Sequence, residues 1–470
     1  MLFNKPYLLF LIGVFAAFVL PAGAQPKKNY NVLLIMSDDL NVNMECYGNP
    51  FVKTPNLNSL VKRSVRFDRA YTQFPLCSPS RVSMLTGYRP DVTGVYDLVK
   101  LFRDNIPDAV TLPQLFRSNG YFSCRVGKIF HYGVPGQIGT NGQDDSVSWD
   151  KRVNPIGIDK KEEDKLVNFT PQRGIGSSFT YMISEGDDEL QTDGIAATEA
   201  IKVMEEVRDK PFFLAVGFYR PHCPFVAPRK YFEMYPEKVE LPKRHPDDWK
   251  DIPQVAAWSA ENFGVDELKC QEILRAYYAS VSFMDAQVGR LLEALDRLKL
   301  ANNTIVVFAS DHGYLTGEHG QWMKQSLFEP SARVPLIISV PGQTNGIPCK
   351  RTVELLDVYP TLTDLCGLTP PKDIQGKSLS VLLKNPDARW EKPAYTQVQR
   401  ILRRGQPDQK FIMGRSVRNE RWRYNEWDEG KEGVELYDHQ SDPEEYTNLA
   451  KDTRYTSVVK DMSALLRKNK

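Results

Sequence analysis

Short apolar runs alternate with amphipathic stretches along most of the chain. Residues 271–300 carry apolar side chains at helical spacing over several turns, and a shorter helical stretch lies around 192–208. Four runs are typical of buried strands: NVLLIM at 31–36, PFFLAVGF at 211–218, TIVVFAS at 304–310 and VPLIISV at 334–340. This alternation of strand and helix predicts an α/β sheet flanked by helices.

The chain divides into two unequal parts. With 470 residues it exceeds one typical domain, so a large domain with a smaller companion is expected. We place the large domain at 25–370 and a smaller, more highly charged C-terminal subdomain at 371–470. Within the large domain, 133–190 is polar with little periodicity, which indicates loops over a site.

The first 24 residues have the pattern of a secretory signal peptide. Lys5 precedes the apolar run YLLFLIGVFAAFVL, and AGA before Gln25 resembles a cleavage site. A retained anchor is the alternative, but the run is shorter than the roughly 20 residues of a spanning helix. We therefore expect an exported protein, periplasmic or secreted, with no stable membrane insertion after cleavage.

Charge and cysteine content narrow the function classes. The net charge is +1 with no block of like charge, which argues against a nucleic-acid partner. The seven cysteines are scattered and never spaced C-x-x-C, so they indicate neither a zinc site nor a dense disulfide framework. Most are expected to be small buried residues, and one or two disulfides stay open.

Acidic residues follow two of the predicted strands. Asp38 and Asp39 come after the first strand, and Asp311 and His312 come after the strand at 304–310. Sites in α/β sheets gather beyond the carboxyl ends of strands. Adjacent carboxylates repel each other unless a cation lies between them, and hard oxygen ligands suit Ca²⁺ or Mg²⁺. Solvated turn residues and helix caps are the alternative.

Several cationic or proton-carrying groups also stand in loop positions. Lys128 and His131 occur in VGKIFHYG, His222 in YRPHCPF and Lys324 in QWMKQ. Each alone could be an ordinary surface or core residue, but together they would suit an anionic substrate. His319 has no such pattern around it and is expected to be structural.

Cys77 opens the stretch CSPSRVSMLTG, which resembles the start of a helix. Ser78 could cap it and Pro79 fits its first turn, where backbone amides favour an anion. A cysteine there with Arg81 nearby would have a lowered pKa, as a thiol nucleophile needs. A buried structural cysteine or half of a disulfide remains equally open on this evidence.

The same stretch resembles the sulfatase signature C-x-P-S-R followed by x-x-x-(L/M)-T-G. The likeness extends along nearly the whole mature chain, including NVLLIMSDDL, PFFLAVGFYRPHCPF, TIVVFASDHGYLTGEHGQWMKQSLFE and ELYDHQSDPEEYTNLA. Within the type I, formylglycine-dependent sulfatases, GYRPDVTGVYDL and VGKIFH are most similar to the iduronate-2-sulfatases. The resemblance implies an alkaline-phosphatase-like α/β fold, with a large mixed sheet flanked by helices and a smaller C-terminal α+β subdomain.

The resemblance also implies a chemical role for Cys77. A maturation enzyme would recognise the motif and oxidise this cysteine to Cα-formylglycine, whose hydrate attacks sulfur and then expels sulfate. One Ca²⁺, with Mg²⁺ the less favoured ion, would be held by the residues that match the family's ligands: Asp38, Asp39, Cys77, Asp311 and His312. A nitrogen ligand departs from the all-oxygen preference of such an ion.

Five further residues match catalytic positions of the family. Arg81 and Lys128 would hold the formylglycine hydrate, and His131 would assist its collapse as a base. His222 and Lys324 would bind sulfate oxygens, with His222 also donating a proton to the leaving alcohol.

The expected substrate is a sulfated carbohydrate, with a 2-O-sulfated uronic acid of a glycosaminoglycan or similar polysaccharide as the best example. The enzyme would remove the sulfate from the sugar at the end of the chain. The loops at 133–190 and 400–430 would set the sugar, and four residues could line its pocket: Arg89, Asp91, Tyr96 and Asp97. The alternatives are a phosphatase, phosphodiesterase or phosphonate hydrolase of the same superfamily, a plain thiol hydrolase, and a non-catalytic carbohydrate-binding homologue.

Overall fold

The computed structural model describes residues 1–2, 30–343 and 346–468. Apart from its first two residues, the predicted signal peptide lies outside the described residues. Within these ranges no helix combines the length and the apolarity needed to span a bilayer.

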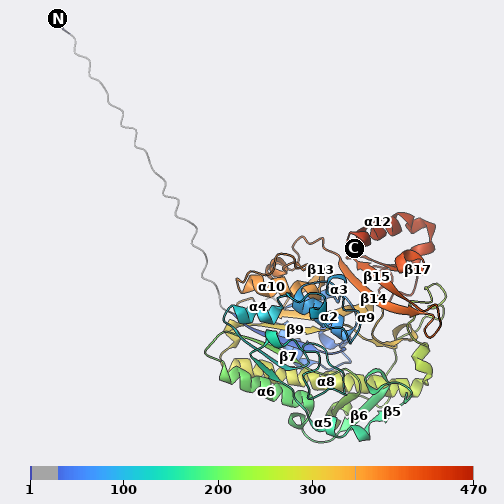
Figure 1. Cartoon of the computed structure of the whole chain (residues 1–470), viewed down its shortest axis with the longest axis horizontal. Helices are drawn as coiled ribbons and strands as arrows, with labels where there is room; N and C mark the ends of the chain where they lie inside the picture. The colour runs from blue at the N-terminus through green and yellow to red at the C-terminus, as the bar shows by residue number, and fades with distance from the viewer. Residues whose placement is uncertain (3–29, 344–345, 469–470) are drawn as a thin grey trace.

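A mixed sheet of eight strands forms the centre of the large unit (Figure 1). Its strands, in spatial order, are β13 (Pro348–Glu354), β2 (Val65–Tyr71), β12 (Arg333–Ser339), β9 (Thr304–Ser310), β1 (Asn31–Ser37), β7 (Phe212–Gly217), β3 (Phe122–Gly127) and β4 (Lys151–Val153). Strands β9, β1, β7, β3 and β4 are parallel, whereas β12 is antiparallel to both β2 and β9. The parallel part places the carboxyl ends of five strands along one edge.

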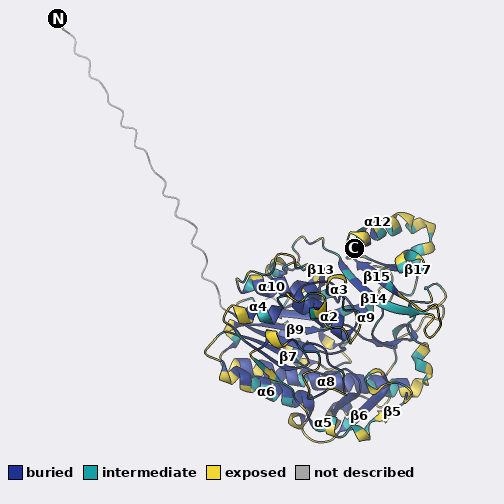
Figure 2. Cartoon of the chain, viewed as in Figure 1, coloured by how far each residue is buried: buried dark blue, intermediate teal, exposed yellow. Residues whose placement is uncertain are grey.

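Helices cover both faces of this sheet, as the alternation of elements predicts (Figure 1). One face carries α6 (Thr192–Glu206) and α8 (Glu267–Arg297), and the other carries α2 (Cys77–Thr86), α4 (Leu112–Ser118) and α10 (Val358–Leu365). Strand β1 serves both cores, because Leu33 and Ile35 face the α8 side while Leu34 and Met36 face the α2 side. Figure 2 shows the sheet buried between the two helical layers.

Helix α8 confirms the long amphipathic pattern. It begins after Asp266, whose side chain accepts a hydrogen bond from the amide of Lys269, a typical N-cap. Its apolar face, including Ile273, Met284 and Leu291, is fully buried in the core. Each such side chain stabilises the fold by roughly 1.5–3 kcal/mol relative to exposure.

The C-terminal part forms a second, antiparallel sheet in the order β14 (Ala394–Leu402), β15 (Lys410–Arg418), β16 (Trp422–Trp427) and β17 (Gly433–Asp438). Helix α12 (Thr456–Arg467) packs on it through Met462 and Leu466. The expectation of a loop at 400–430 is therefore wrong for most of that range, since only 403–409 connects β14 to β15. The smaller α+β subdomain expected from the resemblance is present.

Two other regions complete the chain. The segment 133–190 is mostly irregular, as expected, but it also contains β4, β5 (Val167–Asn168) and β6 (Thr180–Ser184), and the last two form a small sheet with β8 (Phe225–Pro228). The remaining short elements are α1 (Pro55–Val61), α3 (Pro90–Thr93), α5 (Ile158–Lys161), α7 (Arg229–Phe232), β10 (Leu315–Thr316), β11 (Trp322–Met323), α9 (Glu329–Ala332) and α11 (Ser380–Lys384).

The C-terminal sheet is fixed to the segment that leads into α2. The amide of Gln397 donates to the carbonyl of Gln73 at 2.9 Å, and the hydroxyl of Thr396 donates to the carbonyl of Thr72 at 2.6 Å. Strand β14 therefore lies against the approach to Cys77, and the C-terminal sheet can contribute side chains to the same region.

Candidate active site

The acidic residues predicted at two strand ends lie side by side. Strands β1 and β9 are parallel neighbours with Ser37 opposite Ser310, so the residues that follow each strand emerge together. The amide of Asp39 donates to Oδ1 of Asp311 at 3.2 Å. Asp39 has a left-handed backbone (φ 65), a conformation that Asp tolerates better than most residues.

Cys77 is the first residue of α2. The helix begins two residues earlier than expected, because Leu76 is the N-cap and Ser78 does not cap it. No side chain caps this end, so the amides of the first turn point at whatever binds beside Cys77. The helix ends at Gly87, whose left-handed conformation (φ 77) suits a residue without Cβ.

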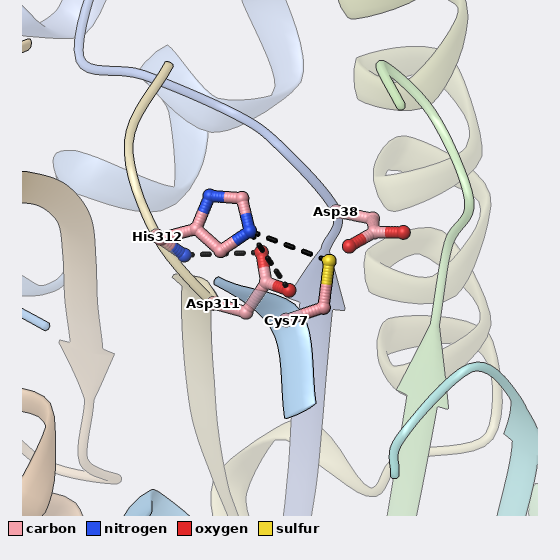
Figure 3. Close-up of side chains that lie close together, drawn as sticks. All are labelled: Asp38, Cys77, Asp311 and His312. Atoms are coloured by element: carbon pink, nitrogen blue, oxygen red, sulfur yellow. Dashed lines mark hydrogen bonds and ion pairs between the residues drawn. The ribbon is translucent and has the colours of Figure 1, made fainter. Parts of the chain in front are cut away.

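Four groups surround the sulfur of Cys77, which is 1% exposed. Nε2 of His312 lies 3.4 Å away, Nζ of Lys324 3.2 Å and Oδ1 of Asp39 4.0 Å. His131 is close enough to interact with it electrostatically. Figure 3 shows Cys77 pointing into the space between the strand-end residues.

Arg81 ties the site together one helical turn after Cys77. Its Nε donates to Oδ2 of Asp311 at 2.8 Å, and Nη2 donates to Oδ1 of Asp38 at 3.1 Å. Its Nη1 donates to the carbonyls of Lys128 and Ile129. The guanidinium is fully buried, and all of these bonds hold the two carboxylates in fixed positions.

The two carboxylates differ in their electrostatics. Burial and the neighbouring Cys77 raise the pKa of Asp38, but Lys128 and Arg81 outweigh them and hold it well below its ordinary value. Nζ of Lys128 donates to Oδ2 of Asp38 at 2.6 Å. Burial raises the pKa of Asp311 despite Arg81. Its cations thus keep Asp38 ionised, whereas burial works against the charge on Asp311, which a cation bound beside it would relieve.

The thiol of Cys77 is strongly activated in this setting. Burial raises its pKa, but Lys128, Lys324 and His312 together bring that pKa well below its ordinary value. Position 77 therefore favours a negative charge on the atom that occupies it.

Two histidines of the site have pKa values shifted in opposite directions. Burial lowers the pKa of His222, but Asp39 outweighs it and raises that pKa to about 10. Its Nδ1 donates to the carbonyl of Cys223 at 2.6 Å, which leaves Nε2 3.8 Å from Oδ2 of Asp39. His131 behaves oppositely, because burial lowers its pKa and keeps the ring neutral. One ring is thus suited to donate a proton and the other to accept one.

The site has the donor set of a metal centre. One ligand atom from each of four buried residues lies within 4.8 Å of the others: Asp38, Cys77, Asp311 and His312. Asp39 is placed in a second such group with Cys77 and His222. Its Oδ1 accepts from Lys324 at 2.5 Å, whereas its Oδ2 is buried with no hydrogen-bond partner among the described residues. A buried carboxylate oxygen without a partner is costly unless a cation occupies the space beside it.

A cavity of about 1210 Å³ opens from Asp39 and Lys324. Of the residues expected in a sugar pocket, Asp91, Tyr96 and Asp97 line it. The remaining one, Arg89, does not, and this expectation is wrong. Its guanidinium donates to both oxygens of Glu354 at 2.7 Å and is buried in that pair.

Besides Lys324, four cationic side chains line this cavity: Lys100, Arg173, Arg400 and Arg404. None of them belongs to a motif, and two come from the C-terminal sheet region, so the sequence analysis missed all four. The only sequence signal was that Arg173, Arg400 and Arg404 lie within the segments 133–190 and 400–430, which were expected to set the sugar.

Tyr277 is a further residue that sequence reasoning assigned only to a helix core. From α8, its hydroxyl donates to the carbonyl of Asp39 and accepts from the amide of Asn41, both at 3.0 Å. It thereby fixes the left-handed turn that carries Asp39. His319 has the structural role expected of it: Nδ1 lies 3.0 Å from Asp248, and the ring stacks on Phe328.

All seven cysteines are free and buried. The disulfides left open by the sequence are therefore absent, and the apolar environment of the other six agrees with a packing role.

The model of the sulfatase family matches residues 30–368, and that of the N-sulphoglucosamine sulphohydrolase C-terminal region matches 317–470. The chain belongs to the sulfatase family. It is 36% identical to the iduronate 2-sulfatase of Homo sapiens over 415 residues, which cover 77% of this chain and 74% of that protein. It is also 32% identical to a sulfatase of Formosa agariphila over 459 residues, covering 93% and 86%.

The fold is shared more widely. The crystal structure of the phosphonate monoester hydrolase of Agrobacterium radiobacter superposes with a TM-score of 0.73 at 23% identity, covering 93% of this chain and 95% of that chain. The alkaline-phosphatase-like architecture is thus confirmed. Family membership makes the protein a sulfuric ester hydrolase, as the resemblance to sulfatases implied.

Proposed function

We propose that this sulfatase removes a sulfate group from a carbohydrate, using Cys77 after its oxidation to Cα-formylglycine together with one divalent cation. The observation that carries the proposal is the position of Cys77. It stands at the uncapped start of α2, within 4.0 Å of Asp39, His312 and Lys324, and two of these, Asp39 and Lys324, line a large cavity.

Formylglycine suits this position better than a thiol does. As a hydrate, residue 77 supplies two hydroxyl groups on one carbon, one to attack sulfur and one that permits sulfate to leave. Lys128 and Lys324 stabilise negative charge at the attacking atom, as they do at the present sulfur. His131, whose pKa burial lowers and whose ring interacts with residue 77, would take up a proton there.

The cation would be held by Asp38, Asp39, Asp311 and His312, with residue 77 completing the set. Oδ2 of Asp39, buried without a hydrogen-bond partner among the described residues, and the grouping of the ligand atoms support this fit. Three carboxylates favour Ca²⁺ over softer ions, with Mg²⁺ the alternative. Such an ion supplies positive charge that stabilises the oxygens of the transferring sulfate.

His222 and Lys324 act on the substrate side. The protonated ring of His222 is held by the carbonyl of Cys223, so Nε2 can donate a proton to the leaving alcohol. The ammonium of Lys324 is shared between Asp39 and Cys77 and can bind a sulfate oxygen as the substrate enters. Arg81 and Lys128 would hold the acidic side chains and the hydrate at residue 77 in fixed positions.

A 2-O-sulfated uronic acid at the end of a glycosaminoglycan or similar chain is the substrate that we infer. The cationic wall suits a sugar with a second negative group, and iduronate 2-sulfatase is among the relatives. Residues 1–24 would direct export. Every residue of α2 is buried, so the maturation enzyme must reach Cys77 before the chain folds.

The test is sulfate release by purified, matured protein. The panel contains a 2-O-sulfated uronic acid disaccharide, a 6-O-sulfated glucosamine and matched phosphate mono- and diesters, with Cys77→Ala as control. We expect release from the 2-O-sulfated uronate above all others and none from the variant. Turnover of phosphate esters alone would overturn the sulfatase mechanism, whereas turnover of the glucosamine ester alone would overturn only the sugar assignment.

A further inference from the structure

Two arginines on the cavity wall lack a carboxylate partner. Arg173 lies between β5 and the following 3-10 turn, and Arg400 lies on β14. Within the described ranges neither forms an ion pair with Asp or Glu, although most buried arginines of this protein do. A partly buried guanidinium that has no counter-charge in its own chain is poised for an anion from outside.

Arg173 is held in place by aromatic rings and one carbonyl. Its guanidinium lies 4.1 Å from the ring centre of Phe263 and 5.7 Å from that of Trp258. Its Nε donates to the carbonyl of Ser177 at 2.6 Å. These contacts use one of its donors and orient the plane of the group, while the remaining donors have no protein partner among the described residues.

Arg400 is held in the same manner from the other sheet. Its Nε donates to the carbonyl of Val255 at 3.1 Å and Nη1 to the carbonyl of Gln399 at 3.3 Å. The guanidinium lies 5.1 Å from the ring centre of Trp427. Its Nη2 is buried with no hydrogen-bond partner in the described part of the chain. Burial lowers the pKa of Arg400 to about 10, although the charge of Glu435 acts in the opposite direction.

One segment, 255–263, connects both arginines to the catalytic lysine. It supplies the carbonyl that binds Arg400 and the two rings that hold Arg173. Trp258 anchors it, because the indole donates to the carbonyl of Trp322 at 3.1 Å, two residues before Lys324. The two arginines and Lys324 therefore belong to one continuous wall.

We propose that Arg173 and Arg400 form a second anion subsite, which binds a negative group of the substrate other than the sulfate that is cleaved. The inference rests on the proposed function and deepens it. The shared chemistry is a planar or tetrahedral oxyanion, either the carboxylate of a uronic acid or a second sulfate on the sugar chain. The protein would thereby discriminate against singly charged sulfate esters.

The experiment compares substrates that differ only in the second charge. Arg173→Met and Arg400→Met are measured against the 2-O-sulfated uronate disaccharide, its uronate methyl ester, a form with an added sulfate on the neighbouring sugar, and 4-nitrophenyl sulfate. Arg389→Met is the matched control, because Arg389 is exposed and pairs only with Glu391. Binding of the same disaccharides to variants that also carry Cys77→Ala is measured by calorimetry.

We expect each variant to lose ~10–100-fold in kcat/KM on a doubly charged substrate, mainly through KM, as for a lost charged hydrogen bond. Activity on 4-nitrophenyl sulfate should stay unchanged. If the carboxylate is the ligand, the methyl ester costs the wild type a similar factor and the variants lose no more on it. If a second sulfate is the ligand, the loss appears only on the form with the added sulfate.

Equal losses on 4-nitrophenyl sulfate and the disaccharides, or no loss on any doubly charged substrate, would overturn the subsite while leaving the proposed function standing. A wild-type protein that cleaves no sulfate ester would instead overturn the proposed function, and the subsite with it.

Discussion

The ammonium of Lys324 lies 3.2 Å from the sulfur of Cys77, although 247 residues separate them in the chain. Lys324 follows the short strand β11, and Cys77 begins α2. The same ammonium donates to Oδ1 of Asp39 at 2.5 Å. One ammonium therefore connects residue 77 to Asp39, which lines the cavity.

This contact predicts the effect of Lys324→Met. Removal of a preorganised donor near developing negative charge costs on the order of 10²–10³ in kcat. We expect that loss on sugar sulfates, with the fold preserved as judged by circular dichroism and thermal unfolding. Lys151→Met is the matched control. Lys151 lies on the outer strand β4 and forms an exposed ion pair with Glu206 at the end of α6. Loss below about tenfold would contradict a role for Lys324 in the transition state.

The acidic group predicts metal dependence. Dialysis against a chelator should abolish sulfate release, and Ca²⁺ should restore it better than Zn²⁺, because the ligands are mainly carboxylates. Elemental analysis should find about one bound divalent ion per chain, and Asp311→Ala should lose it. Asp150→Ala, which removes a partly exposed pair with Arg117 and the acceptor of the Ser123 amide, should retain it. Full activity in the metal-free protein would contradict this part of the account.

The burial of Arg89 predicts a stability effect in place of a substrate effect. Breaking a buried ion pair by removing one partner costs roughly 3–5 kcal/mol, because the remaining charge is uncompensated. Glu354 is fully buried but keeps Lys392 at 2.8 Å as a second partner, so Arg89→Met should lower the free energy of unfolding by less, roughly 1.5–3 kcal/mol. The KM of the protein that remains folded should not change. A raised KM with an unchanged free energy of unfolding would instead show that Arg89 contacts the substrate.

Local patterns were sufficient for the parts of the fold that local physics decides. Strand β1 and helix α8 were predicted because their apolar periodicity is long and uninterrupted. The region of β15 and β16 was misjudged as a loop because its strands carry several charges and are stabilised by partners across the sheet. The cap of α2 was placed at Ser78 from residue type alone, whereas the backbone turns at Leu76.

The site divides in the same way. Asp38 and Asp311 could be placed together because parallel neighbouring strands end at one edge. Arg89 could not be placed, because its partner Glu354 is 265 residues away and leaves no mark on the local sequence. Arg173 and Arg400 were missed for the same reason, since the segment that unites them carries no motif.

The central claim is that residue 77 works as an aldehyde. Trypsin cuts after Arg69 and Arg81, so it releases one peptide, 70–81, that contains this position. Mass spectrometry of that peptide from a preparation with full sulfatase activity should give a mass lower than the unmodified sequence by the difference between a thiol side chain and an aldehyde. An intact, alkylatable cysteine at position 77 in fully active protein would contradict the account.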